Sequence, residues 1–187
     1  PLEAAGSAGM EYPTFITCHA YWGIGPWMKS DETVTIHEFI HQYFQGILAS
    51  NEFEESFMDE GFTQYYEGLI MDEYYPKGSR ANILGLNFNE ASIGRYMYVS
   101  MDNPRIAPIN TKAWIYPGDS YGILTYFKTA TVLKNLEGIL GKKNMKLVMK
   151  NYFEKYINSK VKLKFILQFQ SKTMQKNKIY YFLAHKN

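Results

Sequence analysis

Residues 32–48 read ETVTIHEFIHQYFQGIL and contain the pattern His-Glu-x-x-His. The hydrophobic residues recur every three or four positions, which is typical of one buried face of a helix. A capping residue, Ser30 or Asp31, precedes the stretch and predicts where the helix begins. His37 and His41 are four residues apart and therefore lie on the same helical face. The predicted buried face comprises Val34, Ile36, His37, Ile40, His41, Phe44, Ile47 and Leu48.

Two imidazoles on one face can bind a metal ion, but a tetrahedral site needs a third protein ligand. Zinc commonly takes two histidines and a glutamate through bonds of roughly 2.0–2.1 Å, with water in the fourth position. Glu60 is the candidate, because the 18 residues between His41 and Glu60 allow one helix to end and a second to pack beside it. Glu38, turned about 100° from His37, can reach a metal-bound water and act as general base.

Chance explains this pattern poorly. By composition, roughly 0.4% of chains of this length would contain HExxH, and a glutamate at one fixed spacing lowers that to about 0.03%. The structural alternative is a buried histidine pair whose nitrogens bond to backbone carbonyls. Two histidines around a glutamate are costly to bury without a function, so the metal site is the favoured hypothesis.

The composition describes a folded chain with no electrostatic bias. The 187 residues are 46% hydrophobic and 20% charged, and 20 basic against 18 acidic side chains leave a net charge of +2. No basic block points to nucleic acid. The single cysteine, Cys18, excludes an intrachain disulfide and a cysteine-based zinc cluster. We expect it to be a small buried hydrophobic residue.

Elsewhere the periodicity predicts a mainly helical chain. Residues 10–17 mix aromatic and β-branched residues around a proline, which favours an edge strand. Residues 161–170 alternate partly like a strand. Helices are predicted over 57–74, 89–101, 120–140 and 142–157, with Gly141 dividing the last two.

The motifs resemble those of the gluzincin aminopeptidases, the family of aminopeptidase N and leukotriene hydrolase. His-Glu-x-x-His followed after eighteen residues by glutamate is the family signature. The sequence HQYF from His41 is similar to the family's HQWF, and DEGF from Asp59, with Tyr65 and Glu67, is similar to NEGFA-x-Y-x-E. AGMEY over residues 8–12 resembles GAMEN. The resemblance continues at Tyr126-Phe127-Lys128-Thr129, where the family has Tyr-x-Lys-Gly.

The resemblance implies a substrate site around residues 8–11. In the family, the GAMEN glutamate binds the free α-amine of a peptide, which assigns Glu11 as the amine anchor. Ala8 and Gly9 leave room for substrate backbone to approach. The alternative for Glu11 is a solvated carboxylate on a strand edge.

The resemblance also assigns roles beyond the metal ligands. Tyr126 matches a tyrosine that donates a hydrogen bond to the oxyanion of the reaction, and Tyr121 is expected to line the same pocket. A core tyrosine is the alternative for Tyr126. Glu67, two helical turns after Glu60, is expected to orient a zinc-binding imidazole, and a plain acidic residue on the helix face fits the sequence nearly as well.

The expected fold is α+β and mainly α, a thermolysin-like catalytic core with a small remnant of sheet. Residues 1–157 are assigned to this domain, with its upstream β-rich part missing, and residues 158–187 to a C-terminal segment of undefined structure. The chain begins at Pro1 without an initiator methionine. We therefore expect a fragment with an exposed apolar surface where the missing domains of the full-length enzyme dock.

The predicted function is a zinc aminopeptidase with one Zn²⁺ that hydrolyses the N-terminal bond of peptides with a free N-terminus. Two alternatives stay open, an HExxH endopeptidase and a catalytically incomplete fragment or scaffold. No partner nucleic acid or membrane span is expected. The compartment is left open, with the cytoplasm favoured because no signal peptide or disulfide is found.

Overall fold

The structure is a computed structural model that describes residues 8–20, 23–25 and 27–157. The backbone divides into two compact units, residues 1–145 and residues 146–187. Every residue predicted for the site belongs to the first unit. The C-terminal segment 158–187, with its predicted strand over 161–170, lies outside the described residues.

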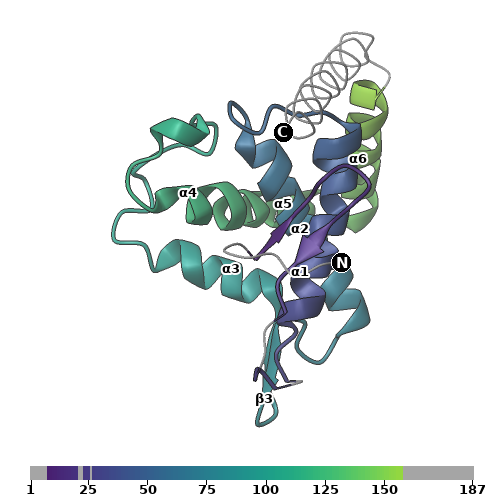
Figure 1. Cartoon of the computed structure of the whole chain (residues 1–187), viewed down its shortest axis with the longest axis vertical. Coiled ribbons are helices and arrows are strands. Elements are labelled where there is room, and N and C mark those ends of the chain that lie inside the picture. The colour runs from purple at the N-terminus through teal and green to yellow at the C-terminus, as the bar shows by residue number, and fades with distance from the viewer. Residues whose placement is uncertain (1–7, 21–22, 26, 158–187) are drawn as a thin grey trace, which may run out of the picture. The chain divides into compact units, whose positions relative to one another are not determined.

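The described chain is mainly helical with two small antiparallel sheets of two strands each, which confirms the α+β, mainly α prediction (Figure 1). The helices are α1 (Ser30–His41), α2 (Phe62–Tyr74), α3 (Glu90–Val99), α4 (Ser120–Gly122), α5 (Thr129–Leu140) and α6 (Lys142–Ile157). The strands are β1 (Gly9–Met10), β2 (Thr17–Cys18), β3 (Ala81–Ile83) and β4 (Leu86–Phe88). Wider, π-type turns occupy η1 (Gln42–Ile47), η2 (Phe57–Gly61) and η4 (Ile123–Lys128), and η3 (Ala113–Ile115) is a short 3₁₀ turn.

The predicted first helix is continuous from α1 through η1, but two details of the prediction were wrong. Ser30 does not cap the helix; it is the first helical residue, and the side chain of the preceding Lys29 makes no capping hydrogen bond. Ile47, predicted to be buried, is 39% exposed. The wider turns of η1 displace residues from the 3.6-residue period on which the prediction depends.

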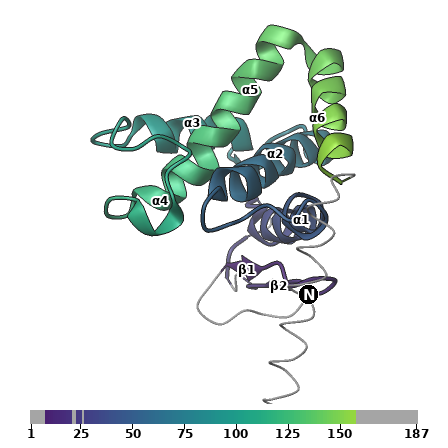
Figure 2. The ribbon, with the colours of Figure 1, turned by 90° about the horizontal axis from the view of Figure 1, so that it is seen from above.

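Helix α1 lies between the β1–β2 hairpin and α2 (Figure 2). Its buried face carries Ile40 together with His37 and His41. On the hairpin side, Gly9 packs against Glu38 so closely that a Cβ at this position would overlap the Glu38 carboxylate. The absence of a side chain at Gly9 therefore allows β1 to lie directly over the helix.

The strand predicted over residues 10–17 is not a strand. Only Gly9–Met10 and Thr17–Cys18 pair, and the residues between them form the loop of a hairpin. Pro13 lacks an N–H for a ladder, and Thr14 adopts a φ of 63° that turns the chain. Glu11, predicted to lie on an edge strand, therefore lies in this loop, directly after β1. Cys18 is buried, as expected.

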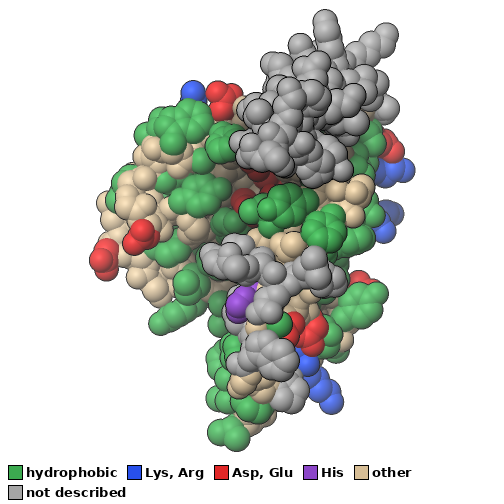
Figure 3. Space-filling model, viewed as in Figure 1, with side chains coloured by type: hydrophobic (Ala, Val, Ile, Leu, Met, Phe, Trp, Pro, Cys, Tyr) green, Lys and Arg blue, Asp and Glu red, His purple; other side chains and the backbone are tan. Residues whose placement is uncertain are grey.

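A second hairpin, β3–β4, was not predicted. Its turn is formed by Leu84 and Gly85, with φ values of 52° and 84°. Positive φ at both central positions is typical of a two-residue type I′ turn. Gly85 is typical of such a turn, but Leu84 is an unusual residue at its first central position. The sequence therefore does not clearly predict a hairpin here. Leu84 is fully exposed, and the tip of this hairpin, at the bottom of Figure 3, is hydrophobic.

The downstream helices follow the prediction. Gly141, at a φ of 79°, separates α5 from α6. The segment η2 packs close to η4 and α5. A Cβ at Gly61 would overlap Thr129 and the carbonyl of Thr125. The glycine after Glu60 therefore lets η2 approach the segment that carries Tyr126.

Candidate active site

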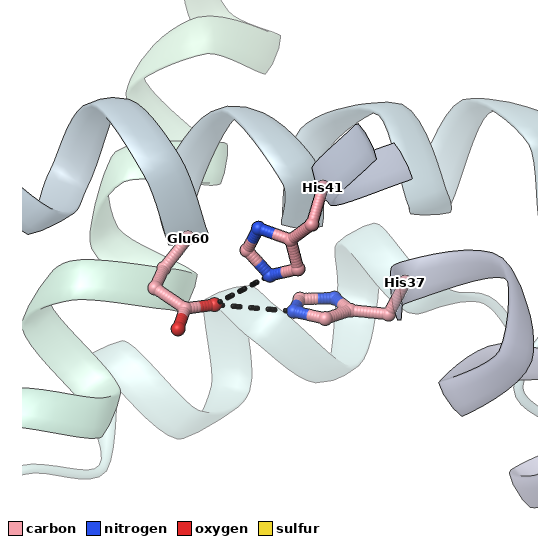
Figure 4. Close-up of side chains that lie close together, drawn as sticks. All are labelled: His37, His41 and Glu60. Carbon is pink, nitrogen blue, oxygen red and sulfur yellow. Dashed lines mark hydrogen bonds and ion pairs between the residues drawn. The ribbon is translucent and has the colours of Figure 1, made fainter. Parts of the chain in front are cut away.

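The structure brings the three predicted metal ligands together (Figure 4). His37 and His41 extend from the buried face of α1, and Glu60 extends from η2. One carboxylate oxygen, Oε2 of Glu60, lies 3.2 Å from Nε2 of His37 and 3.1 Å from Nε2 of His41. The two imidazole ring centroids are 4.8 Å apart and nearly perpendicular. The three side chains therefore converge on one point.

The spacing of these atoms fits a tetrahedral metal ion. Bonds of 2.0–2.1 Å at tetrahedral angles separate neighbouring ligand atoms by about 3.3 Å. The observed separations of 3.1 and 3.2 Å between each histidine Nε2 and Glu60 Oε2 are close to that value. Two nitrogens and one carboxylate oxygen are also a donor set that zinc commonly takes. The residues present thus match a zinc ion in geometry and in chemistry.

A second carboxylate holds the far nitrogen of each imidazole. Nδ1 of His37 lies 2.8 Å from Oε2 of Glu67, and Nδ1 of His41 lies 2.6 Å from Oδ1 of Asp59. A carboxylate accepts hydrogen bonds, so Nδ1 must carry the proton. The lone pair for a metal is then on Nε2, which is the atom that faces Glu60.

Asp59 is the residue that sequence reasoning missed. It is 1% exposed, and the one feature of the sequence that could have identified it is its position immediately before the predicted ligand Glu60. A buried aspartate at that position is expensive without a donor, and His41 supplies the donor. Thr63 adds a hydroxyl 3.3 Å from Nδ1 of His41.

The carboxylate of Glu67 continues into a buried polar network. Gln64 Nε2 donates to Glu67 at 2.7 Å and to Glu90 at 3.3 Å. Glu90 in turn lies 3.9 Å from the guanidinium of Arg80. Burial, together with the charge of Glu67, raises the pKa of Glu90 to about 8. Through Glu67, these hydrogen bonds fix the orientation of the His37 ring from α2 and α3.

The site is electrostatically coupled. Burial alone would lower the pKa of both histidines, but the surrounding carboxylates raise it to about 9 for His37 and about 11 for His41. Burial alone would raise the pKa of Glu60, but its hydrogen bonds with both rings hold it well below the usual range. Without a metal, both rings therefore bind protons that a metal ion must displace.

Glu38 lies beside the metal ligands but outside their hydrogen bonds. Its side chain is buried, with the residue 6% exposed. Burial raises the pKa of Glu38 to about 7, although the charges of His37 and His41 act in the opposite direction. A carboxyl group with this pKa can both accept and return a proton near neutral pH.

An open cleft of about 680 Å³ surrounds these groups. Ala8, Gly9 and Glu11 line one wall, and Tyr121 and Tyr126 line it from the other helices. Its lining includes six glutamates and a single arginine; the acidic residues are Glu11, Glu38, Glu52, Glu60, Glu67 and Glu90. The cleft is therefore suited to a cationic group.

The two predicted tyrosines pack next to the histidines. The Tyr126 ring stacks on the ring of His37 at a centroid distance of 5.7 Å and an angle of 11°. Tyr121 meets Tyr126 edge to face at 6.4 Å. Burial and the negative charge of Glu60 raise the pKa of Tyr126 above its usual range and that of Tyr121 to about 12. Both phenols therefore stay protonated and able to donate.

A mainly helical core that directs two histidines and a glutamate into an acidic cleft defines a metallopeptidase of the HExxH class. The model of the peptidase family M1 domain matches residues 10–184. The chain belongs to peptidase family M1.

Similar proteins carry aminopeptidase names. The chain is 26% identical to leucine aminopeptidase 2-1 of Meyerozyma guilliermondii over 152 residues, which are 79% of this chain and 24% of the relative. It is 28% identical to leucine aminopeptidase 2 of Kluyveromyces lactis, over 68% of this chain and 20% of the relative. Aminopeptidase N of Rattus norvegicus is also 28% identical, over 66% of this chain and 13% of the relative. The chain thus spans a quarter or less of the length of these curated relatives.

No solved structure is significantly similar to this chain. Within the described residues, none of the helices has the length and apolar character needed to cross a membrane.

Proposed function

We propose that the protein is a zinc-dependent aminopeptidase, which removes the first residue of a peptide with a free N-terminus. The observation that carries this proposal is that Nε2 of His37 and Nε2 of His41 lie 3.2 and 3.1 Å from the same oxygen, Oε2 of Glu60, inside the acidic cleft. Membership of peptidase family M1 supports the same reaction class.

The ligand residues would be His37, His41 and Glu60, with Asp59 and Glu67 holding the two rings. When bound, zinc supplies a Lewis acid that polarises the substrate carbonyl and lowers the pKa of a bound water. Charged second-sphere carboxylates raise the basicity of the imidazoles and fix their tautomer.

Glu38 is the proposed general base. Its carboxylate takes a proton from the attacking water and then delivers it to the nitrogen of the leaving amine. Burial raises the pKa of this carboxyl above its usual range, which favours its return of the proton to the leaving amine. Gly9 keeps the space over this carboxylate free of a side chain.

Tyr126 is the proposed oxyanion donor. Its raised pKa, caused by burial and the charge of Glu60, keeps the hydroxyl protonated. A hydrogen bond that strengthens as the carbonyl oxygen gains charge can contribute about 3–4 kcal/mol of transition-state stabilisation. Tyr121 packs against this ring and is proposed to line the substrate pocket.

Glu11 is the proposed anchor for the substrate's α-ammonium group. It lines the cleft on the hairpin side. A carboxylate and an ammonium form a charge-assisted hydrogen bond, which is stronger than a neutral one. This contact would place the first peptide bond, rather than an internal one, next to Glu38.

Cleavage of an alanyl or leucyl fluorogenic amide, compared with its N-acetylated twin, tests the proposal. We expect cleavage of the free-amine substrate alone, loss of activity with a chelator and recovery with zinc. Equal cleavage of both substrates would replace the proposal with an endopeptidase. Absence of cleavage with about one zinc ion per chain would mean a built but incomplete catalytic site.

We also infer that residues 1–157 form a thermolysin-like catalytic domain and that further domains of a longer enzyme dock on it. Large apolar side chains on the surface support docking, because monomeric proteins rarely expose wide apolar areas. Phe39, Tyr43 and Ile47 form one such exposed row along α1 and η1. Hydrophobic side chains also cover much of the face in Figure 3.

A further inference from the structure

The side chain of Gln42 connects the helix that carries the metal ligands with the loop that carries Glu11. Gln42 directly follows His41. Its Oε1 accepts a hydrogen bond from the backbone N–H of Thr14 at 2.9 Å. Its Nε2 donates to the carbonyl of Tyr12 at 3.2 Å and lies 3.4 Å from the carbonyl of Glu11. A single amide group thus contacts three residues of the loop.

The loop has little internal support. Strands β1 and β2 pair over two residues each. Phe15 N–H donates to Tyr12 at 2.9 Å, closing a turn with Pro13 and Thr14 at its centre. Thr14 has a φ of 63°, which is unfavourable for a β-branched residue. The hydrogen bond of a β-turn joins only the carbonyl of its first residue to the N–H of its fourth. The N–H of Thr14, the third residue, therefore has no partner within the turn, and Gln42 provides one.

The position of Glu11 depends on this contact. Glu11 lies between β1, which packs over Glu38, and the turn that Gln42 holds. Gln42 itself is not among the residues that line the cleft. It therefore acts on the substrate site only through the backbone of the loop.

We propose that Gln42 is a positioning residue that holds Glu11 at a fixed distance from the metal ligands. The inference rests on the proposed function of Glu11 as amine anchor. His41 and Gln42 are consecutive, so one rigid segment sets both the metal end and the amine end of the bound peptide. Only a peptide whose amine and first peptide bond match that separation is held correctly for reaction.

The first test is Gln42→Ala, assayed with the alanyl or leucyl fluorogenic amide whose α-amine is free. We expect KM to rise about tenfold with kcat changed less than about twofold, because lost hydrogen bonds to the loop weaken substrate binding rather than the chemical step. Zinc content should equal that of the wild type. Independently of activity, hydrogen exchange of the Thr14 amide, measured by NMR, should become about tenfold faster.

Two further variants separate positioning from a general effect on folding. Gln42→Glu keeps an acceptor for Thr14 but loses the donor to Tyr12, so it should recover part of the KM increase and most of the Thr14 protection. Gln45→Ala is the matched control on the same helical segment. The Gln45 side chain makes no hydrogen bond to the described part of the chain, and both KM and exchange should stay at wild-type values.

The outcomes distinguish this inference from the proposed function. If the wild type cuts the acetylated twin as well as the free amine, the amine anchor is wrong and the positioning inference falls with it. If the wild type discriminates but Gln42→Ala leaves KM unchanged, only the positioning inference is overturned. A fall in kcat at constant KM, or loss of zinc, would also overturn it.

Discussion

The metal-ligand cluster and the β1–β2 hairpin both contribute residues to the same cleft but are built in different ways. In the cluster, each imidazole is buried and each has a carboxylate on its Nδ1. In the hairpin, Tyr12 and Phe15 are about half exposed, and among the residues that the structure describes, Gln42 alone donates or accepts side-chain hydrogen bonds with the backbone of the loop. A buried imidazole with a polar partner on each of its two nitrogens has fewer accessible orientations than a side chain on an exposed loop.

This contrast assigns different tasks to the two regions. Chemistry at the metal requires ligand atoms fixed to within about half an ångström, which the packing of α1 against η2 and α2 provides. Recognition of the substrate's amino terminus requires less precise positioning. A loop held by a few side-chain hydrogen bonds can provide that recognition. We therefore expect changes in the cluster to affect metal and rate, and changes in the hairpin to affect substrate selection.

The largest effect is expected for Glu60→Gln. An amide oxygen is a poor substitute for the carboxylate, so zinc content should fall below half an ion per chain and kcat/KM by about a thousandfold or more. Elemental analysis and the amide assay measure both. Glu73→Gln, an exposed position on α2, is the control and should behave like the wild type. Full zinc occupancy in Glu60→Gln would contradict its role as ligand.

The next largest effect, on zinc affinity, is expected for Asp59→Asn. The amide can no longer accept a charge-assisted bond from His41 Nδ1, and loss of such a partner typically weakens zinc binding by roughly 10- to 100-fold. Competition with a chromophoric chelator measures the affinity. An unchanged affinity would mean that the 2.6 Å contact between His41 and Asp59 does not support the ligand.

Glu11→Gln tests the hairpin side. Removing the carboxylate should raise KM for the free-amine substrate about 30-fold, as for a lost charge-assisted hydrogen bond, while zinc content stays constant. The preference over the acetylated twin should shrink in proportion. Glu55→Gln, exposed and outside the cleft, is the matched control. A parallel loss of zinc would remove the distinction between the two regions.

The smallest effect is expected for Tyr65→Phe, which removes a hydrogen bond between α2 and α5, away from the metal ligands. The Tyr65 hydroxyl donates to Glu137 at 2.6 Å and joins α2 to α5. Its loss should lower the free energy of unfolding by about 1 kcal/mol, measured by urea denaturation. Tyr66→Phe is the control, because the Tyr66 hydroxyl has no hydrogen-bond partner among the residues that the structure describes. An equal loss in both variants would contradict the role of this bond.

This last difference should depend on pH. Burial alone would raise the pKa of Glu137, but bonds from Tyr65 and Lys134 lower it below its ordinary value of 4.5. A carboxyl with a lowered pKa in the folded state stabilises the protein above pH 4.5, and this contribution disappears as the pH falls through the folded-state pKa. The difference between Tyr65→Phe and the wild type should therefore shrink in acid. A difference that grows in acid would contradict the assignment.

The helices and the convergence of His37, His41 and Glu60 could be predicted from the sequence because both depend largely on spacing along the chain. His37 and His41 share a face in any α-helix, and the eighteen residues between His41 and Glu60 are enough for the first helix to end and a second to pack beside it. The ends of α2 and α5 and both bounds of α6 follow from periodicity and from Gly141 in the same way, whereas the π-type turns that precede α2 and α5 were not predicted. These features need no knowledge of distant contacts.

The tertiary structure decided the features that depend on contacts between distant segments. Whether Asp59 is a surface carboxylate or the partner of His41 depends on how η2 packs against α1. The loop conformation of Glu11 depends on Gln42, some thirty residues away, which supports a φ that Thr14 disfavours on its own. Local propensity cannot encode a hydrogen bond whose two ends meet only after the chain has packed. For this reason the cluster of His37, His41 and Glu60 is predictable from the sequence, while the conformation of the loop that carries Glu11 is not.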